Sequence, residues 1–343
     1  MWKLPALVSV VLALGAMPEA SGQDGPKIEV LDALSPLATS QQLTARLLTP
    51  LMQDKIARFR AASGVELKEQ SLGAGREKVR VWVPDHPPGE RLGILVFMWP
   101  AEGIEPPPDW WRMLREQRLV YVAPMETGNT ENVFDRRVPL ALHAYEYARS
   151  RFDIDEARVF IGGFSGGSRV AQRVALAYPD VFRGVMLVGG SDPIGTAGFT
   201  PPEASLMSLF QTRSRIVYAT GDRDLPNRAK DERTRRSFEA LCVAGVVQVS
   251  QPRLDHWVPD GRGLRKALVA LQSPSLAEAT EGACRQGLAQ RVEQELAGVE
   301  SLVAQGRAED ARARLVAIDA MYGGLAAPRS VELARRLEGP VTP

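Results

Sequence analysis

Short apolar runs alternate with amphipathic stretches through the middle of this chain, and no other feature constrains the fold as strongly. The runs lie at 79–83, 94–98, 119–123, 159–161, 185–188, 216–219 and 246–249. The amphipathic stretches, with apolar residues at helical spacing, lie at 110–118, 138–152, 168–178, 228–244 and 263–271. Strands that alternate with helices predict an α/β protein whose mostly parallel sheet has helices on both faces. Such sheets bind their ligands at the carboxyl ends of the strands.

Ser165 lies between glycines, directly behind one of the predicted strands. Residues Gly163 to Gly167 match G-x-S-x-G, the pattern of a nucleophilic serine on a sharp strand-to-helix turn. A phosphate-binding loop is excluded, because no Gly-Lys-Ser/Thr follows and the glycines do not fall at G-x-G-x-x-G offsets. The five-residue match alone is weak evidence. The predicted strand before it and the predicted helix after it are the context that a nucleophile on this turn requires.

A serine hydroxyl needs a neighbouring base to act as a nucleophile at neutral pH. The sequence has three histidines, and His86 and His143 both precede Ser165. In enzymes with this turn the acid and then the histidine follow the serine along the chain. His256, in the segment LDHWVPD, is therefore the predicted base.

The acid that orients this base is expected after the next-to-last strand, in the segment ATGDRDLPN. We predict Asp224, because Gly221 can make the turn and a carboxylate three positions later can reach the imidazole. Asp222 is the second candidate, and Asp192, after the preceding strand, is the third. Asp255 adjoins the histidine and is badly placed to accept a hydrogen bond from its ring.

An oxyanion intermediate needs two N–H donors that are already in position. The first is expected from Gly166, the residue after the nucleophile. The second is expected from the loop after the run 94–98, which reads WPAEG. Pro100 has no N–H to donate, so Ala101 is the predicted second donor.

Several residues near predicted strand ends are candidates for substrate binding. The tryptophans among them are Trp99, Trp110, Trp111 and Trp257, and we assign substrate contact to Trp99 and Trp257. Asn129 follows the strand that ends near 123 and is a third candidate, although turn formation explains an asparagine there equally well. No metal site or cofactor is predicted, because three scattered histidines offer no ligand cluster.

Composition adds the broad class and the compartment. The chain has 343 residues, a net charge of +1 and 45% hydrophobic residues, and it lacks the charge excess typical of nucleic-acid binding. Residues 1–22 combine a basic start, an apolar run too short to span a bilayer and a small-residue cleavage pattern. We read them as a cleaved signal peptide, which predicts a secreted or periplasmic protein without a stable membrane span. Cys242 and Cys284 could form a disulfide there or remain buried thiols.

We expect four parts along the chain: the signal peptide at 1–22, an N-terminal segment at 23–75, a catalytic domain at 76–273 and a helical extension at 274–343. The N-terminal segment contains a helical pattern at 43–59. In the extension, Gly306 separates two amphipathic stretches that resemble one tetratricopeptide-like unit. A single such unit cannot bury its own apolar face, so it either docks on the domain or binds a protein partner.

The motifs together resemble one branch of the α/β-hydrolases, the secreted polyhydroxybutyrate depolymerases and feruloyl esterases. The resemblance lies in RVFIGGFSGG, YPDVFRGVMLVGG, TGDRD and DHWVPD, and more loosely in RVWVP and DWWRMLREQRLVYVAP. It covers roughly residues 78–262 and neither end of the chain. It implies the α/β-hydrolase fold and an extracytoplasmic hydrolase of small or polymeric carboxylic esters, with Ser165 as nucleophile, His256 as base and Asp224 as orienting acid.

Two other functions remain open at this point. Members of the same superfamily cleave peptides, so a serine peptidase is one alternative. A non-catalytic binding protein that uses the helical extension for a partner is the other, and the unusual Trp99-Pro100 loop favours it slightly.

Overall fold

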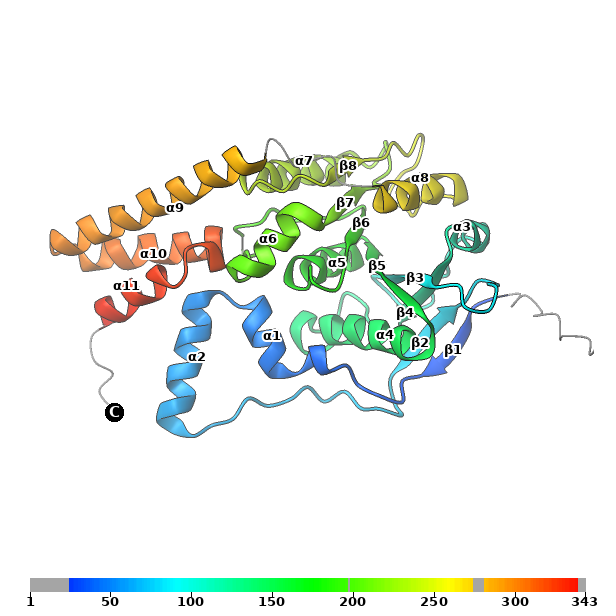
Figure 1. Ribbon diagram of the computed structural model, residues 1–343, viewed down its shortest axis with the longest axis horizontal. Coiled ribbons are helices and arrows are strands. Elements are labelled where there is room, and N and C mark those ends of the chain that lie inside the picture. The colour runs from blue at the N-terminus through cyan, green and yellow to red at the C-terminus, as the bar shows by residue number, and fades with distance from the viewer. Residues whose placement is uncertain (1–24, 197, 274–280, 339–343) are drawn as a thin grey trace, which may run out of the picture.

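A central eight-stranded sheet organises the computed structural model, which describes residues 25–196, 198–273 and 281–338 (Figure 1). The strands are β1 (Lys27–Val30), β2 (Lys78–Trp82), β3 (Leu92–Met98), β4 (Leu119–Pro124), β5 (Ile154–Phe164), β6 (Gly184–Val188), β7 (Arg215–Tyr218) and β8 (Val246–Gln248). Their spatial order is β1-β2-β4-β3-β5-β6-β7-β8. β2 pairs antiparallel with β1 and β4, and the other neighbouring strands are parallel.

This order and these strand directions are those of the α/β-hydrolase fold, so the predicted fold class is confirmed. The seven predicted strands all form. β1 was not predicted; it is short, lies at the edge of the sheet and is largely exposed, so its sequence carries little apolar signal.

Helices cover both faces of the sheet. One face packs against α3 (Trp110–Glu116) and α8 (Gly261–Gln272), and the other packs against α4 (Val138–Arg151), α5 (Gly166–Ala177), α6 (Ala204–Arg213) and α7 (Leu225–Ala240). Figure 1 shows these two layers on either side of the strands. Successive strand residues point to opposite faces, so Leu95 and Phe97 join the first layer while Ile94 and Val96 join the second. Burial on both faces explains why the strands read as continuous apolar runs.

The N-terminal segment packs along the α4 side of the sheet. It contains β1, the short helix η1 (Pro36–Ala38), α1 (Ser40–Leu47) and α2 (Pro50–Ser63). The helical pattern predicted at 43–59 is thus two helices. The break falls where Thr49 caps α2 and Pro50 occupies its first turn, because proline has no N–H to continue the preceding helix.

The C-terminal helices are α9 (Glu281–Ala304), α10 (Ala308–Tyr322), η3 (Gly323–Leu325) and α11 (Arg329–Glu338). The chain reverses between α9 and α10 at Gly306, whose φ of 72° favours glycine. Leu296 and Val299 of α9 and Leu315 of α10 are buried. They belong to the same hydrophobic core as the residues between the sheet and α4.

Ionic contacts join these helices to the N-terminal segment. The buried carboxylate of Asp54 in α2 accepts from Arg58 Nε at 2.9 Å and from Arg335 Nε of α11 at 3.0 Å. Asp319 of α10 accepts from the backbone N–H of Leu51 at 3.3 Å. The two terminal parts therefore dock on each other as well as on the central sheet.

A disulfide joins Cys242, at the end of α7, to Cys284 in α9. It anchors the first of the C-terminal helices to the body of the domain.

The predicted signal peptide at 1–22 lies outside the described residues. Within those residues, no helix combines the length and hydropathy needed to cross a bilayer.

The disulfide should contribute substantially to stability. Its half-cystines are 42 positions apart, and closing a loop of that length in the unfolded chain corresponds to about 4 kcal/mol in the chain-entropy model. We expect Cys242→Ser/Cys284→Ser to lower the free energy of unfolding by about 2–4 kcal/mol in urea titrations. Wild-type protein under reducing conditions should behave like the double variant, and equal stability of variant and oxidised wild type would contradict this.

His143 should make stability depend on pH. It is buried in α4 and accepts from Ser35 N–H at Nδ1 over 2.9 Å, and burial lowers its pKa to about 4. The unfolded histidine titrates near 6.5, so between these values only the unfolded chain gains the proton. The free energy of unfolding should therefore fall as pH drops from about 6.5 to about 4, by up to about 3 kcal/mol from this residue. In His143→Gln, the free energy of unfolding from denaturation curves should depend less on pH over that interval. An unchanged dependence on pH would exclude this role.

Candidate active site

Ser165 stands on a strained turn between β5 and α5. Its φ of 53° and ψ of −118° lie in a region that residues with a side chain rarely adopt. The turn is held because Ser165 N–H donates to the Val188 carbonyl at 2.8 Å, which links it to the end of β6. Such strain at a serine after the central strand is the geometry expected of a nucleophile elbow.

Glycines on both sides of the turn permit this conformation. A Cβ on Gly163 would stand 2.5 Å from the carbonyl carbon and oxygen of Gly167. A Cβ on Gly167 would stand 2.1 Å from the Met98 carbonyl oxygen, at the end of β3. The helix start therefore packs directly on the backbone of β3 and β5, and the motif glycines are explained by this close approach.

Three side chains from three separate loops meet at this edge of the sheet. His256, in the loop after β8, places Nε2 3.1 Å from Ser165 Oγ. Its Nδ1 lies 2.6 Å from Oδ2 of Asp224, which follows β7. The side chain of Asp224 is 5% exposed, whereas that of His256 is 44% exposed. The structure thus brings together the three residues that the sequence singled out.

The proton positions follow from these distances. A carboxylate can only accept hydrogen bonds, so the short contact places a hydrogen on His256 Nδ1 that is donated to Asp224. In this tautomer Nε2 is an acceptor, and it faces the Ser165 hydroxyl. This is the arrangement in which the hydroxyl proton can pass to the ring.

Asn227 is a further site residue that the sequence analysis missed. Its Nδ2 donates to both carboxylate oxygens of Asp224 at 2.9 Å and lies 3.1 Å from His256 Nδ1, because both nitrogens donate to the same carboxylate. Asp224 precedes α7 and Asn227 lies in its first turn. The i to i+3 spacing was the available signal, but it does not distinguish a cap from a site contact.

Two more glycines let the histidine loop approach the other loops. A Cβ on Gly189 would stand 2.9 Å from His256 Cε1, and one on Gly221 would stand 2.2 Å from the Leu254 carbonyl oxygen. The imidazole therefore lies over the backbone at the end of β6. The loop that carries it packs on the turn that leads to Asp224.

A second carboxylate, Asp231, links the loops after β6 and β7 through hydrogen bonds. It accepts from Ser191 Oγ at 2.5 Å and from Thr220 Oγ1 at 2.6 Å, while Thr220 Oγ1 accepts from Gly189 N–H at 3.0 Å. Burial raises the pKa of Asp231, and the nearby Asp224 carboxylate raises it further. This network fixes Gly189, the residue against which the His256 ring packs.

The other acid candidates lie elsewhere. Asp222 accepts from Ser250 Oγ at 2.8 Å and braces a turn, and Asp192 pairs with Arg169 Nε at 3.1 Å. Among the described residues, the Asp255 carboxylate makes no hydrogen bond or ion pair with His256.

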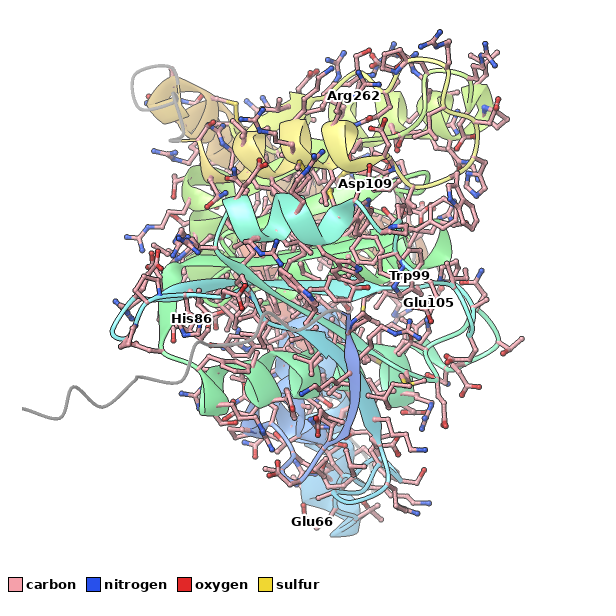
Figure 2. The ribbon with its side chains drawn as sticks, turned by 90° about the vertical axis from the view of Figure 1, so that its right-hand side faces the viewer. Glu66, His86, Trp99, Glu105, Asp109 and Arg262 are labelled. Atoms are coloured by element: carbon pink, nitrogen blue, oxygen red, sulfur yellow. A yellow bond between two sulfur atoms is a disulfide. The ribbon has the colours of Figure 1, made fainter. Side chains whose placement is uncertain are left out.

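The other two histidines are also excluded as bases. His143 is bonded to Ser35 in the core of the α4 face. Figure 2 shows His86 at the opposite end of the sheet from Trp99, which directly follows β3.

The structure changes the interpretation of Trp99. We predicted substrate contact, but Trp99 is 4% exposed and packs against Phe97 and Trp110 between the sheet and α3. Its indole N–H donates to Tyr121 Oη at 2.8 Å. The alternating direction of side chains turns it into the core, so a place near a strand end did not suffice to predict exposure.

Trp257 does lie at the surface beside the site. Its side chain is 48% exposed and packs edge-on against Phe164, the buried residue before Ser165. Phe164 also packs against the His256 ring, with 4.9 Å between ring centroids. Leu225, directly after Asp224, is 69% exposed. An apolar rim therefore borders the histidine.

The predicted oxyanion donors lie at the start of α5 and in the loop after β3. Gly166 begins α5, so its N–H has no partner within the helix. Ala101 lies in the exposed turn after β3. Asn129, in the loop after β4, contacts the Gly166 side of the turn and donates its backbone N–H to the Pro100 carbonyl at 2.7 Å. Within the described part of the chain, no cluster of three His, Cys, Asp or Glu residues could hold a metal.

Comparison with known proteins gives structural matches alone, since neither a family model nor a curated protein sequence matches this chain. An esterase from Pyrobaculum calidifontis is 16% identical over 57% of this chain and 81% of its own, with a TM-score of 0.44. Est1E from Butyrivibrio proteoclasticus is 11% identical over 56% and 91%, with a TM-score of 0.41. The poly(3-hydroxybutyrate) depolymerase LpqC from Bordetella parapertussis is 16% identical over 61% and 88%, with a TM-score of 0.43.

The two glycines after Ser165 offer a matched test of the packing. Gly167→Ala should lower the free energy of unfolding by about 2 kcal/mol or more, because its Cβ meets the β3 backbone. For Gly166→Ala the three nearest atoms all belong to the exposed Asn129 side chain, which can rotate away, so stability should change by less than about 1 kcal/mol. Urea titration of both variants checks this, and equal losses would show that the elbow is less tightly packed than described.

Proposed function

We propose that this protein is a serine hydrolase that cleaves carboxylic esters through an acyl-enzyme on Ser165. The observation that carries the proposal is the continuous hydrogen-bonded chain from buried Asp224 through His256 to Ser165. This chain ends at the strained elbow that carries Ser165, at the carboxyl edge of the sheet, where substrates of such folds bind. A non-catalytic scaffold has no need of a strained serine aligned with an acceptor nitrogen.

Acylation begins when Ser165 Oγ attacks the carbonyl carbon of the ester. As the C–O bond forms, the hydroxyl proton passes to His256 Nε2 and the carbonyl electron pair moves to oxygen. Gly166 N–H, with Ala101 as the predicted second donor, stabilises that oxyanion. Asp224 holds the ring and balances the charge of the imidazolium. The intermediate then releases the alcohol, whose oxygen takes the proton from Nε2.

Deacylation repeats these steps with water. His256 Nε2 accepts a proton from the water molecule as its oxygen attacks the acyl carbon. The second oxyanion collapses, the bond to Ser165 Oγ breaks and Oγ recovers the proton from the ring. Free acid leaves, and the enzyme returns to its starting protonation state.

The exposure of the site supports esters that extend along the surface. His256 lies open, and the apolar rim formed by Trp257 and Leu225 is exposed as well. Such a rim suits apolar acyl or aryl groups of small esters and also segments of a polymeric ester. The resemblance of the motifs to polyester depolymerases and feruloyl esterases supports the same substrate class.

The compartment belongs to the same proposal. The sequence of residues 1–22 supports export, and the disulfide between Cys242 and Cys284 supports an oxidising environment. We therefore place the enzyme outside the cytoplasm.

Kinetics on p-nitrophenyl esters of increasing chain length, feruloyl esters and a short peptide test this function. We expect hydrolysis of short to medium acyl esters. Ser165→Ala should lower kcat/KM by at least about 10⁴-fold, and Asp224→Asn by about 10³–10⁴-fold. Asp222→Asn, which removes a neighbouring carboxylate outside the chain of bonds, should stay within about threefold of wild type.

Labelling with a fluorophosphonate separates the alternatives. Wild type should label and Ser165→Ala should not. Folded wild type that neither labels nor cleaves any ester would refute the enzyme and favour a binding protein. Cleavage of the peptide in preference to the esters would instead identify a peptidase.

A further inference from the structure

The carboxamide of Asn129 occupies the space that a side chain at position 166 would fill. A Cβ built on Gly166 would stand 1.9 Å from Asn129 Oδ1, 2.7 Å from Cγ and 2.9 Å from Nδ2. The amide group therefore lies against the residue that follows the nucleophile. Gly166 is also the first of the proposed oxyanion donors, so the amide lies beside a residue whose N–H is proposed to bind the oxyanion.

The loop that carries Asn129 is fastened to the loop after β3. Asn129 N–H donates to the Pro100 carbonyl at 2.7 Å, and Thr127 N–H donates to Glu102 Oε1 at 3.1 Å. Glu131 N–H closes a turn on the Gly128 carbonyl at 3.0 Å. These bonds fix the backbone that carries Asn129 without any substrate, so only rotation of its side chain is needed to place the amide group against an oxyanion.

The amide group has no partner of its own. Across the described residues, neither Oδ1 nor Nδ2 of Asn129 makes a hydrogen bond, and the side chain is exposed. Asparagines in turns usually bond to nearby backbone, as Asn132 does here with Phe134 N–H and Asp135 N–H. Asn129 makes no such bond among the described residues, so its two side-chain N–H groups are available to a ligand.

The distances fit two donors that share one oxygen. A Cβ lies about 2.5 Å from the nitrogen of its own residue, so Asn129 Nδ2 is within about 5.5 Å of Gly166 N. Two N–H groups that each donate to one oxygen over about 2.9 Å have nitrogens roughly 4–5 Å apart. The upper bound of about 5.5 Å is compatible with this spacing.

The sequence assigned the second donor to Ala101 in the loop after β3, and the loop bonded to it carries the Asn129 amide as a further donor. Pro100 has no N–H, and its carbonyl is instead the acceptor for Asn129. We propose that Asn129 Nδ2–H donates to the oxyanion together with Gly166 N–H. This inference rests on the serine-hydrolase function proposed above and makes Asn129 a catalytic residue rather than a general substrate contact.

Two substitutions at this position test the inference. Asn129→Asp keeps the size of the side chain and Asn129→Ala removes it, but both delete the N–H donor. On an ester that wild type cleaves, each should lower kcat by about 10²–10³-fold with KM within about threefold. Thr130→Ala, in the next exposed residue of the loop, is the matched control and should retain wild-type kcat.

A second measurement excludes a merely structural effect. A boronic acid forms a tetrahedral adduct on serine, so its affinity should fall in both Asn129 variants by a factor similar to that in kcat. The corresponding unreactive amide, which binds without forming an oxyanion, should bind within about threefold of wild type. Urea titrations should show free energies of unfolding that differ from wild type by less than about 0.5 kcal/mol, because the side chain is exposed.

The outcomes separate this inference from the broader function. Active wild type with Asn129→Ala and Asn129→Asp within threefold in kcat would overturn the role of Asn129 and leave the hydrolase intact. A large loss that appears in KM and equally in affinity for the amide would also overturn it, by assigning Asn129 to ground-state binding. Folded wild type inert toward both esters and fluorophosphonate would refute the function itself, and this inference with it.

Discussion

The 2.6 Å contact between His256 Nδ1 and Asp224 Oδ2 is the interaction on which the arrangement of the site depends. It fixes which nitrogen of the ring carries the hydrogen, and so turns Nε2 into an acceptor directed at Ser165. The carboxylate can do this because it is buried and yet accepts hydrogen bonds from two side chains, those of His256 and Asn227. Asn227 contributes two of these bonds, and the Asp231 network below holds the backbone against which the ring packs. Without these contacts an exposed imidazole would sample many orientations.

Close approach of backbone to backbone brings the three residues together. Ser165, Asp224 and His256 follow β5, β7 and β8, and parallel strands deliver all three to one edge of the sheet. The closest approaches between these loops occur at glycines, which have no side chain. Gly167 lets the helix start reach β3, while Gly189 and Gly221 let the histidine loop settle over the ends of β6 and β7. Gly166 leaves room for the Asn129 amide in the same way.

Sequence patterns predicted the fold because strands buried on both faces read as apolar runs, and the order of serine, acid and histidine selected the residues that the structure brings together. Side-chain direction and loop docking were harder to predict. Trp99 turns into the core although its neighbours in sequence lie at the active edge. The contact of Asn129 with Gly166 joins a loop to the start of α5 across 37 positions, and nothing local encodes it. The choice between a disulfide and two thiols likewise required the distance between α7 and α9.

Trapping the covalent intermediate tests the central claim most directly. Wild-type protein mixed with a p-nitrophenyl ester, quenched within the first turnover and digested with trypsin, should carry the acyl mass on the peptide 159–169, which contains Ser165. That mass should disappear as product forms and should be absent from Ser165→Ala. Ester cleavage without a label on this peptide, or an identical label in the Ser165→Ala protein, would contradict the nucleophile and the mechanism built on it.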